Sequence, residues 1–475
     1  MLKTEPEVSA PPPRWPLVVL AIATLAIFFW GLGNIPLLSF NEARRAAPVQ
    51  EMLASGDWLI PTLNGQLYIS KPPLLYWLAA IPAWLFNSSS EWIVRLPSAL
   101  AATAITGLSF IILRRRLGLP IAIFTVLVLI TSAGFSAFAR RAEIEMLLAA
   151  CCFGSILGAF EYIFGEQRKY WLDMAFASLG LALLAKGPVA LLFYVPLLLA
   201  FWVKYRDVHA LKCLTHWRGW LIALAIAIPW YLLVSLKLGW DIWSHVVETD
   251  IAGKVETAKS DPLYQYPLWL LADFLPWCLL ALATPRKTMR IWQASRQNVF
   301  MLIAAGLPLI IFSVFANKHA KYLLPTYPAW AALLAMASVA WYARLKIKVR
   351  PWAHAAMAVL VLGFFLYYAL GETRLLAHRY EALPKITARL AKYPDAPIYA
   401  WKNIDPRVVY YYGKPMAVIQ ARELEAKLEA REALLLFVED KIPQQADQMC
   451  KLASFSPYLK HGHQATLLGN GAVCN

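Results

Sequence analysis

Residues Asn41 to Trp77 read NEARRAAPVQEMLASGDWLIPTLNGQLYISKPPLLYW and form the longest polar interval in the first half of a very apolar chain. The interval directly follows one apolar segment and leads into others. It contains charged side chains of both signs, namely Glu42, Arg44, Arg45, Glu51, Asp57 and Lys71. A polar loop held between apolar segments, in which charged and aromatic side chains are concentrated, is where we expect chemistry to take place.

The local pattern of this loop predicts two short helices with a turn between them. Apolar side chains follow helical spacing from Glu42 to Leu53, and Gly56 is expected to end that helix. The stretch from Pro61 to Gly65 indicates turn and extended chain, and Pro72-Pro73 opens a short apolar helix that reaches Phe86. The first helix is expected to lie on the membrane face. The alternative is that this stretch has no function and is simply a solvated loop beside an interfacial helix.

Composition places the chain among polytopic membrane proteins. Its 475 residues are 60% hydrophobic and 16% charged, with a mean hydropathy of +0.52, and soluble domains do not have such a composition. The 20 Trp and 21 Tyr residues suit the two interfacial belts of a membrane protein. The net charge is +16, but the basic residues stand in short clusters between apolar runs. This distribution fits cytoplasmic anchoring and contact with anionic membrane lipids, and it argues against nucleic acid as a partner.

Eleven apolar segments are predicted to be membrane spans. They are residues 15–33, 93–113, 121–138, 147–164, 171–185, 188–204, 218–236, 267–284, 298–316, 322–344 and 352–370. The segment 72–86 is expected to be juxtamembrane or re-entrant, and the predicted count is therefore 11 to 13 transmembrane helices. The first segment has no small-residue cleavage site, so we expect it to remain as an uncleaved span.

The basic loops predict the orientation of the chain. If the N-terminus is cytoplasmic, the cytoplasmic loops are 114–116, 166–169, 204–218, 285–296 and 344–350, and all of them are basic. The first loop, residues 34–92, and everything after residue 370 then lie on the opposite side of the membrane.

The fold class that follows is an all-α polytopic membrane protein with a small C-terminal α/β soluble domain. Residues 1–370 are expected to form the transmembrane domain, and residues 371–475 the soluble domain. Strands are predicted at 397–400, 408–412, 416–419 and 434–438, with a helix at 421–433. Cys450 and Cys474 both fall in the soluble part, and they are expected to pair if that compartment oxidises thiols.

Four further polar groups stand where a membrane protein should avoid them. They are Arg140–Glu145, Lys186–Pro188, Glu248–Asp261 and Asn317–Tyr322. A charge at mid-bilayer costs about 2.5–3.5 kcal/mol on insertion scales, although charges at the interface can simply snorkel. All four groups share a side of the membrane with the first loop. Basic groups that converge there would bind an anion such as a lipid phosphate, and acids among them would stabilise a developing positive centre or accept a proton.

The motifs of the first loop resemble those of the bacterial C-type glycosyltransferases, which use polyprenyl-phosphate sugars. Within this group the chain is most similar to the lipid A aminoarabinose transferases and the protein mannosyltransferases. The matching motifs are Asn41-Glu42-Ala43-Arg44, Gly56-Asp57-Trp58, Lys71-Pro72-Pro73, Arg95-Leu96-Pro97-Ser98, Glu145-Met146-Leu147-Leu148, Lys186-Gly187-Pro188, Leu275-Pro276-Trp277 and Tyr322-Leu323-Leu324-Pro325. The resemblance covers about residues 15–370, and the soluble C-terminal part also suits the family.

The resemblance implies roles by position. Members usually have Asp-Glu at the start of the first loop, and this chain has Asn41-Glu42; the second acidic motif falls on Glu145, with Glu143 nearby. The candidate catalytic residues are therefore Asn41, Glu42, Glu143 and Glu145. The candidate substrate-binding residues are Arg44, Lys71, Lys186, Lys254, Lys321 and Tyr322. The aminoarabinose enzymes can hold a metal through an acid just before Lys-Pro-Pro, where this chain has Ser70, so no metal is expected there and no cofactor is predicted.

Asn41 bears on the acceptor, because an asparagine side chain cannot act as a base. A serine or threonine hydroxyl acceptor needs a base, whereas a phosphate acceptor, with a second pKa of about 6, is already ionised near neutral pH. The substitution therefore favours a phosphorylated glycolipid acceptor over a protein hydroxyl, unless Glu42 or Glu145 serves as the base.

The predicted function is that of an integral-membrane glycosyltransferase in the bacterial inner membrane, with its C-terminal domain periplasmic. It would move a sugar from undecaprenyl phosphate to a lipid A-like or other envelope acceptor on the periplasmic side. The alternative within enzymes is a protein O-mannosyltransferase-like activity on a protein acceptor. An anionic-lipid transporter is an alternative from another class, although transporters tend to show paired repeats and broken helices at mid-membrane. The third alternative is a non-catalytic scaffold that binds lipid, and Asn41 in the usual place of Asp is the one feature that suggests it.

Overall fold

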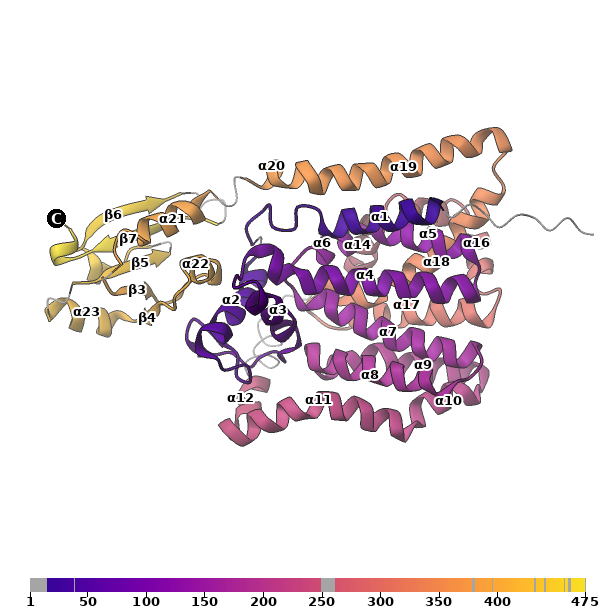
Figure 1. The fold of residues 1–475 in the computed structure, drawn as a ribbon, viewed down its shortest axis with the longest axis horizontal. Coiled ribbons are helices and arrows are strands. Elements are labelled where there is room, and N and C mark those ends of the chain that lie inside the picture. Colours follow the sequence, from indigo (N-terminus) through magenta and orange to yellow (C-terminus); the bar gives the residue numbers. More distant parts are fainter. Residues whose placement is uncertain are drawn as a thin grey trace, which may run out of the picture.

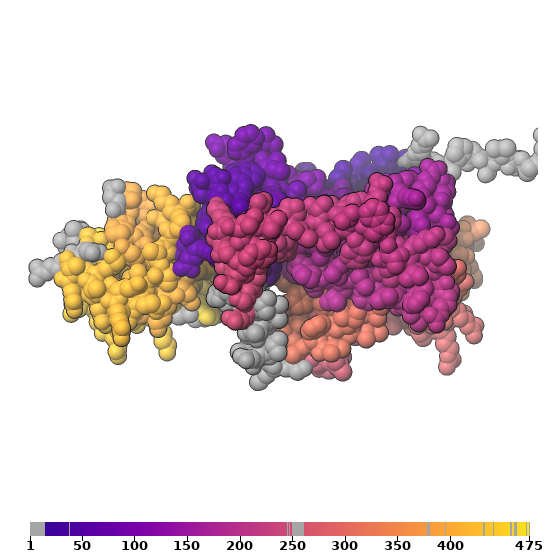
Figure 2. Space-filling model, turned by 90° about the horizontal axis from the view of Figure 1, so that it is seen from below, coloured from indigo at the N-terminus to yellow at the C-terminus, as the bar shows by residue number. Residues whose placement is uncertain are grey.

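The computed structural model describes residues 15–474 apart from 38, 249–260, 378–380, 395, 431–432, 440, 457 and 460–462. Long apolar helices lie side by side in one body, the first loop covers one end of it, and a sheet built from the C-terminal residues stands beyond that loop (Figure 1). Seen from below, the C-terminal part projects from the helical body and meets it at the first loop (Figure 2). The polar loop is therefore enclosed between the membrane helices and the sheet.

The helical body contains the expected membrane spans. Its helices are α1 (Trp15–Phe29), α4 (Glu91–Arg116), α5 (Leu119–Ile130), α6 (Ala133–Ala139), α7 (Ile144–Phe164), α8 (Lys169–Lys186), α9 (Leu191–Tyr205), α10 (Val208–Thr215), α11 (Trp217–Leu238), α12 (Ile242–Val247), α14 (Gln265–Asp273), α15 (Trp277–Leu282), α16 (Pro285–Trp292), α17 (Arg296–Ser313), α18 (Tyr327–Ala343), α19 (Arg350–Leu366) and α20 (Glu372–Leu376). Three 3₁₀ helices, η1 (Pro188–Ala190), η3 (Ala320–Thr326) and η4 (Ile347–Val349), and the π-helix η5 (Tyr367–Gly371) lie between them in the described residues. Each of the eleven predicted segments coincides with a helix or a helix pair.

Length and composition alone select seven of the described helices as membrane-spanning, or up to eight if a bent pair is one span. The bent pair is α5 and α6, which meet at 70°. The predicted count of 11 to 13 is higher because other apolar segments are short or interrupted. α1 has only 15 residues, and α14 and α15 are separated at Leu275-Pro276. The chain is a multi-span membrane protein whichever of these segments are counted.

The first loop has the two predicted helices. α2 spans Phe40–Ser55; the Ser39 hydroxyl caps it by accepting from the Glu42 N–H at 3.1 Å, and Gly56 ends it in the left-handed region at φ 72°. A short hairpin follows, in which the two-residue strand β1 (Thr62–Leu63) pairs antiparallel with the two-residue strand β2 (Gln66–Leu67). α3 spans Leu74–Leu85, and its 12 residues reach about 18 Å, too short for a hydrocarbon core of about 30 Å. This length is consistent with the prediction that 72–86 does not cross.

The C-terminal residues form a five-stranded mixed sheet. β3 (Ile398–Trp401) is parallel to β4 (Ala417–Ile419) and β5 (Leu435–Glu439), while β7 (Ala465–Gly469) is antiparallel to β5 and β6 (Cys450–Phe455), giving the order β4-β3-β5-β7-β6. Three of the predicted strands are confirmed as β3, β4 and β5. Helices α21 (Ala382–Leu390) and α23 (Ala421–Glu429) accompany the sheet, and the second of these was predicted.

One predicted strand is wrong. Residues 408–412 belong to helix α22 (Pro406–Tyr412), whose start is capped by the Asp405 carboxylate and whose end is set by Gly413 at φ 76°. The run of Val and Tyr has the composition of a strand. The cap, the proline at the first helical position and the glycine beyond the end outweigh that preference. Strands β6 and β7 were not predicted, and the expected Cys450–Cys474 disulfide is present, with a Cα–Cα distance of 5.9 Å.

The sheet region is attached to the first loop by hydrogen bonds. Asn64 in the hairpin turn donates to the Met416 carbonyl and accepts from the Met416 N–H, each at 2.7 Å. Tyr411 in α22 donates to the Glu91 carboxylate at 2.8 Å and accepts from the Leu37 N–H at 2.8 Å. The hairpin turn at Asn64 and the start of the loop at Leu37 are thus both held by residues more than 300 positions later in the chain.

Candidate active site

Two carboxylates and two ammonium groups meet at the end of the helical body that faces the first loop. Lys321 Nζ lies 3.1 Å from Glu143 Oε2 and 3.3 Å from Glu145 Oε1, and Lys186 Nζ lies 3.2 Å from the same Glu145 oxygen. We call these four residues the charge cluster. Glu143 and Glu145 are 3% and 7% exposed, so the ion pairs are largely shielded from solvent and from salt.

The local structure explains why the charge cluster forms. Glu143 is the residue before α7, and Glu145 stands in its first turn, where the helix dipole favours a negative charge. Lys186 is in the last turn of α8, where the dipole favours a positive one. α7 is the most buried of the seven candidate spans among the described residues, so the two carboxylates stand at the start of a helix enclosed by other helices.

Glu143 also contacts the first loop. The Ser39 hydroxyl donates to its carboxylate at 3.3 Å, which links the cluster to the cap of α2. Burial raises the pKa of Glu143, and the neighbouring Glu145 charge raises it further against the opposing effect of Lys321. Of the two carboxylates, Glu143 is therefore the one that holds a proton more readily.

Tyr322 joins the cluster through its ring. Lys186 Nζ lies 5.0 Å from the centre of the Tyr322 ring, a cation–π geometry. The sequence placed Lys186, Lys321 and Tyr322 at one membrane face, and the structure brings all three together at the acidic residues of α7.

A second cluster of cations and phenols lies on α2 and the chain after the hairpin. Arg44 donates to the Tyr68 hydroxyl oxygen from Nε at 3.0 Å and from Nη2 at 2.7 Å, and Arg45 Nη1 donates to the same oxygen at 2.8 Å. Arg45 Nη1 also donates to the Tyr76 hydroxyl at 2.9 Å. We call Arg44, Arg45, Tyr68 and Tyr76 the arginine–tyrosine cluster.

Three N–H groups from two cations therefore point at one phenol oxygen, an arrangement that suits a negatively charged oxygen. Burial raises the pKa of Tyr68, but the charges of Arg45 and Arg44 and the hydrogen bonds to its hydroxyl together lower the pKa by more, so the net direction is downward. Arg45 also acts electrostatically on Glu145, and this interaction connects the two clusters.

Lys71 follows the hairpin, and its ammonium group donates to the Ser70 carbonyl at 2.8 Å. Asn41 is half-buried in the first turn of α2. Lys254, which the resemblance suggested as a donor contact, lies outside the described residues. Within the described part of the chain, no group of three or more His, Cys, Asp or Glu side chains is arranged to hold a metal ion.

Glu42 is fully buried and forms no ion pair with Lys186 or Lys321 in the described part of the chain. Its carboxylate accepts from Arg95 Nε at 2.9 Å and Nη2 at 3.4 Å, and from the Ala142 N–H at 3.0 Å. Burial raises the pKa of Glu42, but the charge and hydrogen bond of Arg95, the charge of Arg141 and the Ala142 N–H together lower it by more. These contacts hold α2 against the turn that precedes α7, which is the role of a positioning residue.

Arg95 is the residue that sequence reasoning missed. It is 1% exposed, and besides Glu42 it donates to the carbonyls of Leu32 and Ile35 at 2.8 Å each and of Pro36 at 2.9 Å. It therefore fixes the whole entry of the first loop. The available signal was a charged side chain at the third position of the predicted span 93–113, in the motif Arg95-Leu96-Pro97-Ser98.

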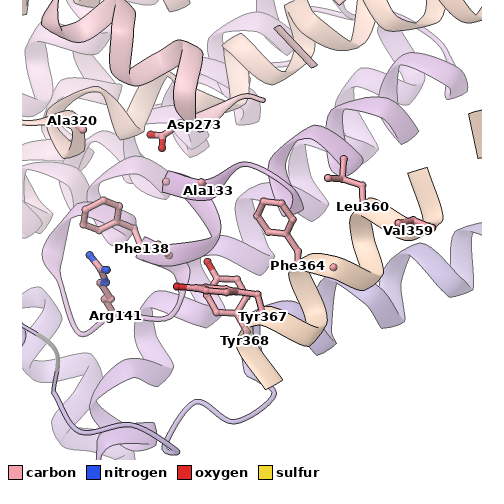
Figure 3. Close-up of a pocket in the computed structure, with 13 residues that line it drawn as sticks. Ala133, Phe138, Arg141, Asp273, Ala320, Val359, Leu360, Phe364, Tyr367 and Tyr368 are labelled. Carbon is pink, nitrogen blue, oxygen red and sulfur yellow. The ribbon is translucent and has the colours of Figure 1, made fainter. Parts of the chain in front are cut away.

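A cavity of about 740 Å³ lies next to the charge cluster, between α6, α14, α19 and η5 (Figure 3). Most of its lining is apolar, with Phe138 and Phe364 among the larger side chains, and Arg141 and Asp273 supply charge. Ala320, the neighbour of Lys321, also lines it. The lining of the cavity thus includes the sequence neighbour of Lys321 and several residues of the largely exposed helix α19.

Comparisons with known proteins agree with the resemblance seen in the motifs. Residues 70–232, about a third of the chain, match the family model described as dolichyl-phosphate-mannose-protein mannosyltransferase. The chain is 24% identical to the undecaprenyl phosphate-alpha-4-amino-4-deoxy-L-arabinose arabinosyl transferase of Shewanella sediminis, over 95% of this chain and 86% of that protein. It is 29% identical to the transferase of the same description from Edwardsiella ictaluri, over 66% of this chain and 58% of that one.

Solved structures show the same fold. ArnT from Cupriavidus metallidurans bound to undecaprenyl phosphate superposes with a TM-score of 0.81 at 20% identity, covering 97% of this chain and 99% of that one. The Archaeoglobus fulgidus oligosaccharyltransferase in its apo form gives a TM-score of 0.53 at 11% identity, covering 90% and 70%. The predicted resemblance to aminoarabinose transferases and protein mannosyltransferases is confirmed, and so is the predicted fold class.

Proposed function

We infer that this chain is a membrane-embedded glycosyltransferase, and we propose that it moves a sugar from undecaprenyl phosphate to a lipid A-like or other envelope acceptor on the periplasmic side of the inner membrane. The aminoarabinosyl transferases match it over most of its length, and the ArnT structure with the same fold is bound to undecaprenyl phosphate. The observation in this chain that carries the proposal is the gathering of cations at one end of the spans. Three N–H groups of Arg44 and Arg45 point at the Tyr68 hydroxyl oxygen, and Lys186 and Lys321 pair with the buried Glu145 carboxylate.

The donor phosphate is assigned to the cations of the first loop. Arg44 and Arg45 already converge on the electron-rich oxygen of Tyr68, and Lys71 stands three residues after Tyr68. A phosphate oxygen satisfies such donors better than a neutral phenol, because charge-assisted hydrogen bonds are roughly twice as strong as neutral ones. Lys254 and Tyr322 are further candidates for contact with the donor.

The reaction is a direct displacement at the anomeric carbon. The bond from an acceptor oxygen to this carbon forms while the bond to the donor phosphate breaks, and the phosphate leaves with the electron pair. Cations beside the leaving phosphate stabilise the charge that accumulates on it in the transition state. Glu145, held between Lys186 and Lys321, keeps these ammonium groups in place and supplies negative charge opposite the developing positive centre.

If the acceptor is a hydroxyl group, we propose Glu143 as the base that accepts its proton. Glu42 is bound to Arg95, and the side chain of Asn41 cannot act as a base. The raised pKa of Glu143 brings it closer to neutral pH, and a general base works best when its pKa is near the working pH. A hydroxyl acceptor would need this residue, whereas an ionised phosphate acceptor would not. The family model of the protein mannosyltransferases keeps a protein O-mannosyltransferase-like reaction as the second candidate.

The activity is tested by comparing the envelope of cells with and without the gene. Mass spectrometry of lipid A and of glycoproteins should show one added sugar on the lipid that disappears with the gene and returns with a plasmid copy. A sugar lost from proteins instead would select the second candidate. An unchanged lipid and protein profile, with the protein present in the membrane, would contradict both.

The donor assignment makes a separate prediction. Arg44→Ala and Lys71→Ala should each weaken binding of undecaprenyl phosphate to the purified protein by about tenfold or more, because each removes a charge-assisted contact worth about 1.5–3 kcal/mol. Lys237→Ala is the matched control: it removes a cation from the same face, where Lys237 makes an exposed pair with Asp57 at 2.8 Å, and such pairs contribute little. Donor affinity equal to wild type in both loop variants would place the phosphate elsewhere.

The orientation is a proposal as well. α10 and α16, which belong to the basic loops, lie at the end of the helical body opposite the sheet (Figure 1), and the positive-inside rule puts that end in the cytoplasm. The Cys450–Cys474 disulfide suits an oxidising periplasm at the other end. Reporter fusions at residues 116, 210, 290 and 475 should report only the last as periplasmic. A cytoplasmic signal from residue 475 would contradict this orientation.

A further inference from the structure

Arg45 uses only one of its nitrogens in the hydrogen bonds of the arginine–tyrosine cluster. Its Nη1 donates to the Tyr68 and Tyr76 hydroxyls at 2.8 and 2.9 Å. Among the described residues no group accepts a hydrogen bond from its Nε or Nη2, and both nitrogens remain accessible in this half-buried side chain. The Nε–Nη2 edge of a guanidinium group can bind a carboxylate through two parallel hydrogen bonds. Arg45 therefore keeps an open edge of the shape that a carboxylate requires.

The neighbouring arginine has no such open edge. Arg44 turns its Nε and Nη2 toward the Tyr68 hydroxyl oxygen, at 3.0 and 2.7 Å. Arg45 is held in the other orientation by two phenols, of which Tyr76 is fully buried. Its guanidinium carbon also lies 5.7 Å from the centre of the Tyr68 ring. Because these contacts fix the side chain in advance, binding through the open edge costs little conformational entropy.

Arg45 acts on both clusters of the candidate active site. Its Nη1 shares the Tyr68 oxygen with Arg44, and that oxygen marks the place assigned to the donor phosphate. Its charge also interacts with that of Glu145 in the charge cluster. In the proposed displacement the sugar stands between the leaving phosphate and the carboxylates. Arg45 is thus placed to contact the sugar as well as the phosphate.

The two clusters together with Lys71 carry an excess of positive charge. Their two carboxylates face five cations, namely Arg44, Arg45, Lys71, Lys186 and Lys321, so the formal charge is +3 when Tyr68 is neutral. The segment 249–260, outside the described residues, has two acids and two lysines and leaves this balance unchanged. The phosphodiester of a polyprenyl-phosphate sugar brings one negative charge. A donor with a neutral sugar therefore leaves two positive charges without a counter-charge.

A protonated amino group on the sugar would add to this excess, and the described acids near the site already have partners. Glu145 is shared by Lys186 and Lys321, and Glu143 binds Lys321. The three other acids of the first loop are bound elsewhere, namely Glu42 by Arg95, Glu51 by the Asn64 N–H and Asp57 by Lys237. An amine is largely protonated near neutral pH, so an amino sugar would meet cations there. A carboxylate on the sugar would instead offset one of the unbalanced charges.

We propose that the sugar on the donor carries a carboxylate, and that Arg45 binds this carboxylate through its Nε–Nη2 edge. The proposal rests on the proposed function, since it concerns the donor of that reaction. It separates this chain from the transferases that match it, which are named for an amino sugar. The competing explanation is that the open edge of Arg45 binds a second oxygen of the donor phosphate.

Three synthetic donors that share one polyprenyl phosphate and one hexose ring, and differ only at C6, test the proposal. C6 is a carboxylate in the first, a CH₂OH group in the second and a CH₂NH₃⁺ group in the third. Native mass spectrometry of the purified full chain, without acceptor, gives their relative affinities. The wild type should bind the carboxylate form about tenfold to hundredfold more tightly than the hydroxyl form, the range of one hydrogen bond between charged groups. The ammonium form should bind most weakly.

Variants of the two arginines assign the preference to a side chain. Arg45→Gln removes both the charge and the fork, and it should bind the carboxylate and hydroxyl forms almost equally. Arg45→Lys keeps the charge without the fork, so it should still bind the ammonium form most weakly but lose most of the preference for the carboxylate. Arg44→Gln is the matched control. It should weaken all three donors by a similar factor and keep their order.

Equal affinity of the wild type for the three donors, or tighter binding of the ammonium form, would overturn the proposal. So would an unchanged order of the three affinities in both Arg45 variants, and an equal loss for all three would make Arg45 a ligand of the phosphate alone. Efficient transfer of the amino sugar would refute the carboxylate and leave the proposed function intact. The expected order of affinities without transfer to any lipid or protein acceptor would contradict the proposed function and leave the carboxylate site standing.

Discussion

Glu145→Gln is expected to lower the rate of sugar transfer by a factor of about 100 or more while leaving the fold intact, a loss typical of removing one preorganised electrostatic group. The substitution keeps the size of the side chain. It removes the charge that both Lys186 at 3.2 Å and Lys321 at 3.3 Å contact through one oxygen. Among the described residues Glu143 then remains as the carboxylate that contacts Lys321, so the net charge of the charge cluster changes from zero to +1.

The measurement is the transfer rate of purified protein in detergent, with donor binding and the melting temperature recorded in parallel. Glu161→Gln is the matched control, since Glu161 lies on the same helix α7 and pairs with Arg116 at 2.6 Å at the far end of it. That variant should keep nearly full activity. A Glu145→Gln enzyme with more than about a tenth of wild-type rate would rule out the electrostatic role assigned here.

Loss of Arg95 should have the largest effect on stability. Arg95→Ala removes the guanidinium that binds the fully buried Glu42 carboxylate and that also satisfies three carbonyl groups. Removing one partner of a buried ion pair costs about 3–5 kcal/mol, so we expect a marked fall in melting temperature and in the amount of protein in the membrane. Arg116→Ala, which breaks a pair whose arginine is 23% exposed, should cost clearly less.

The same experiment separates the two roles considered for Glu42. As a positioning residue, Glu42→Gln should lower the melting temperature, and its effect should not add to that of Arg95→Ala, because neighbouring residues in one network are coupled. If Glu42→Gln abolished transfer with an unchanged melting temperature and an unchanged affinity for the donor, Glu42 would be a catalytic residue, as the motif Asn41-Glu42 suggests.

The sequence predicted what depends on local pattern and membrane chemistry. The helix of the first loop, its end at Gly56 and the positions of the spans follow from periodicity, glycine conformation and apolar length. The helix α22 was missed because a Val-Tyr run favours a strand until the Asp405 cap and Gly413 are given their weight. Strands β6 and β7 were missed because their stability comes from pairing across the sheet.

The sequence predicted which side of the membrane the site residues share, but it did not predict which acidic side chain pairs with which basic one. Charge placement put Glu143, Glu145, Lys186 and Lys321 on one side of the membrane, and that is where they meet. Which acid pairs with which base depends on the packing of α7 against α8 and η3, a property of long-range contacts. For this reason Glu42 and Glu145 were treated as equivalent acids, although Arg95 binds one and the two lysines bind the other.

The bonds between Asn64 and Met416 have a consequence for the timing of synthesis. Their two partners are 352 residues apart, and a ribosome that adds about 5–20 residues per second needs about 20–70 s to pass from one to the other. During this interval the first loop has already been synthesised, but the residues that hold its hairpin in place do not yet exist. The hairpin can therefore form its bonds to Met416 only after α22 and the start of β4 have been made.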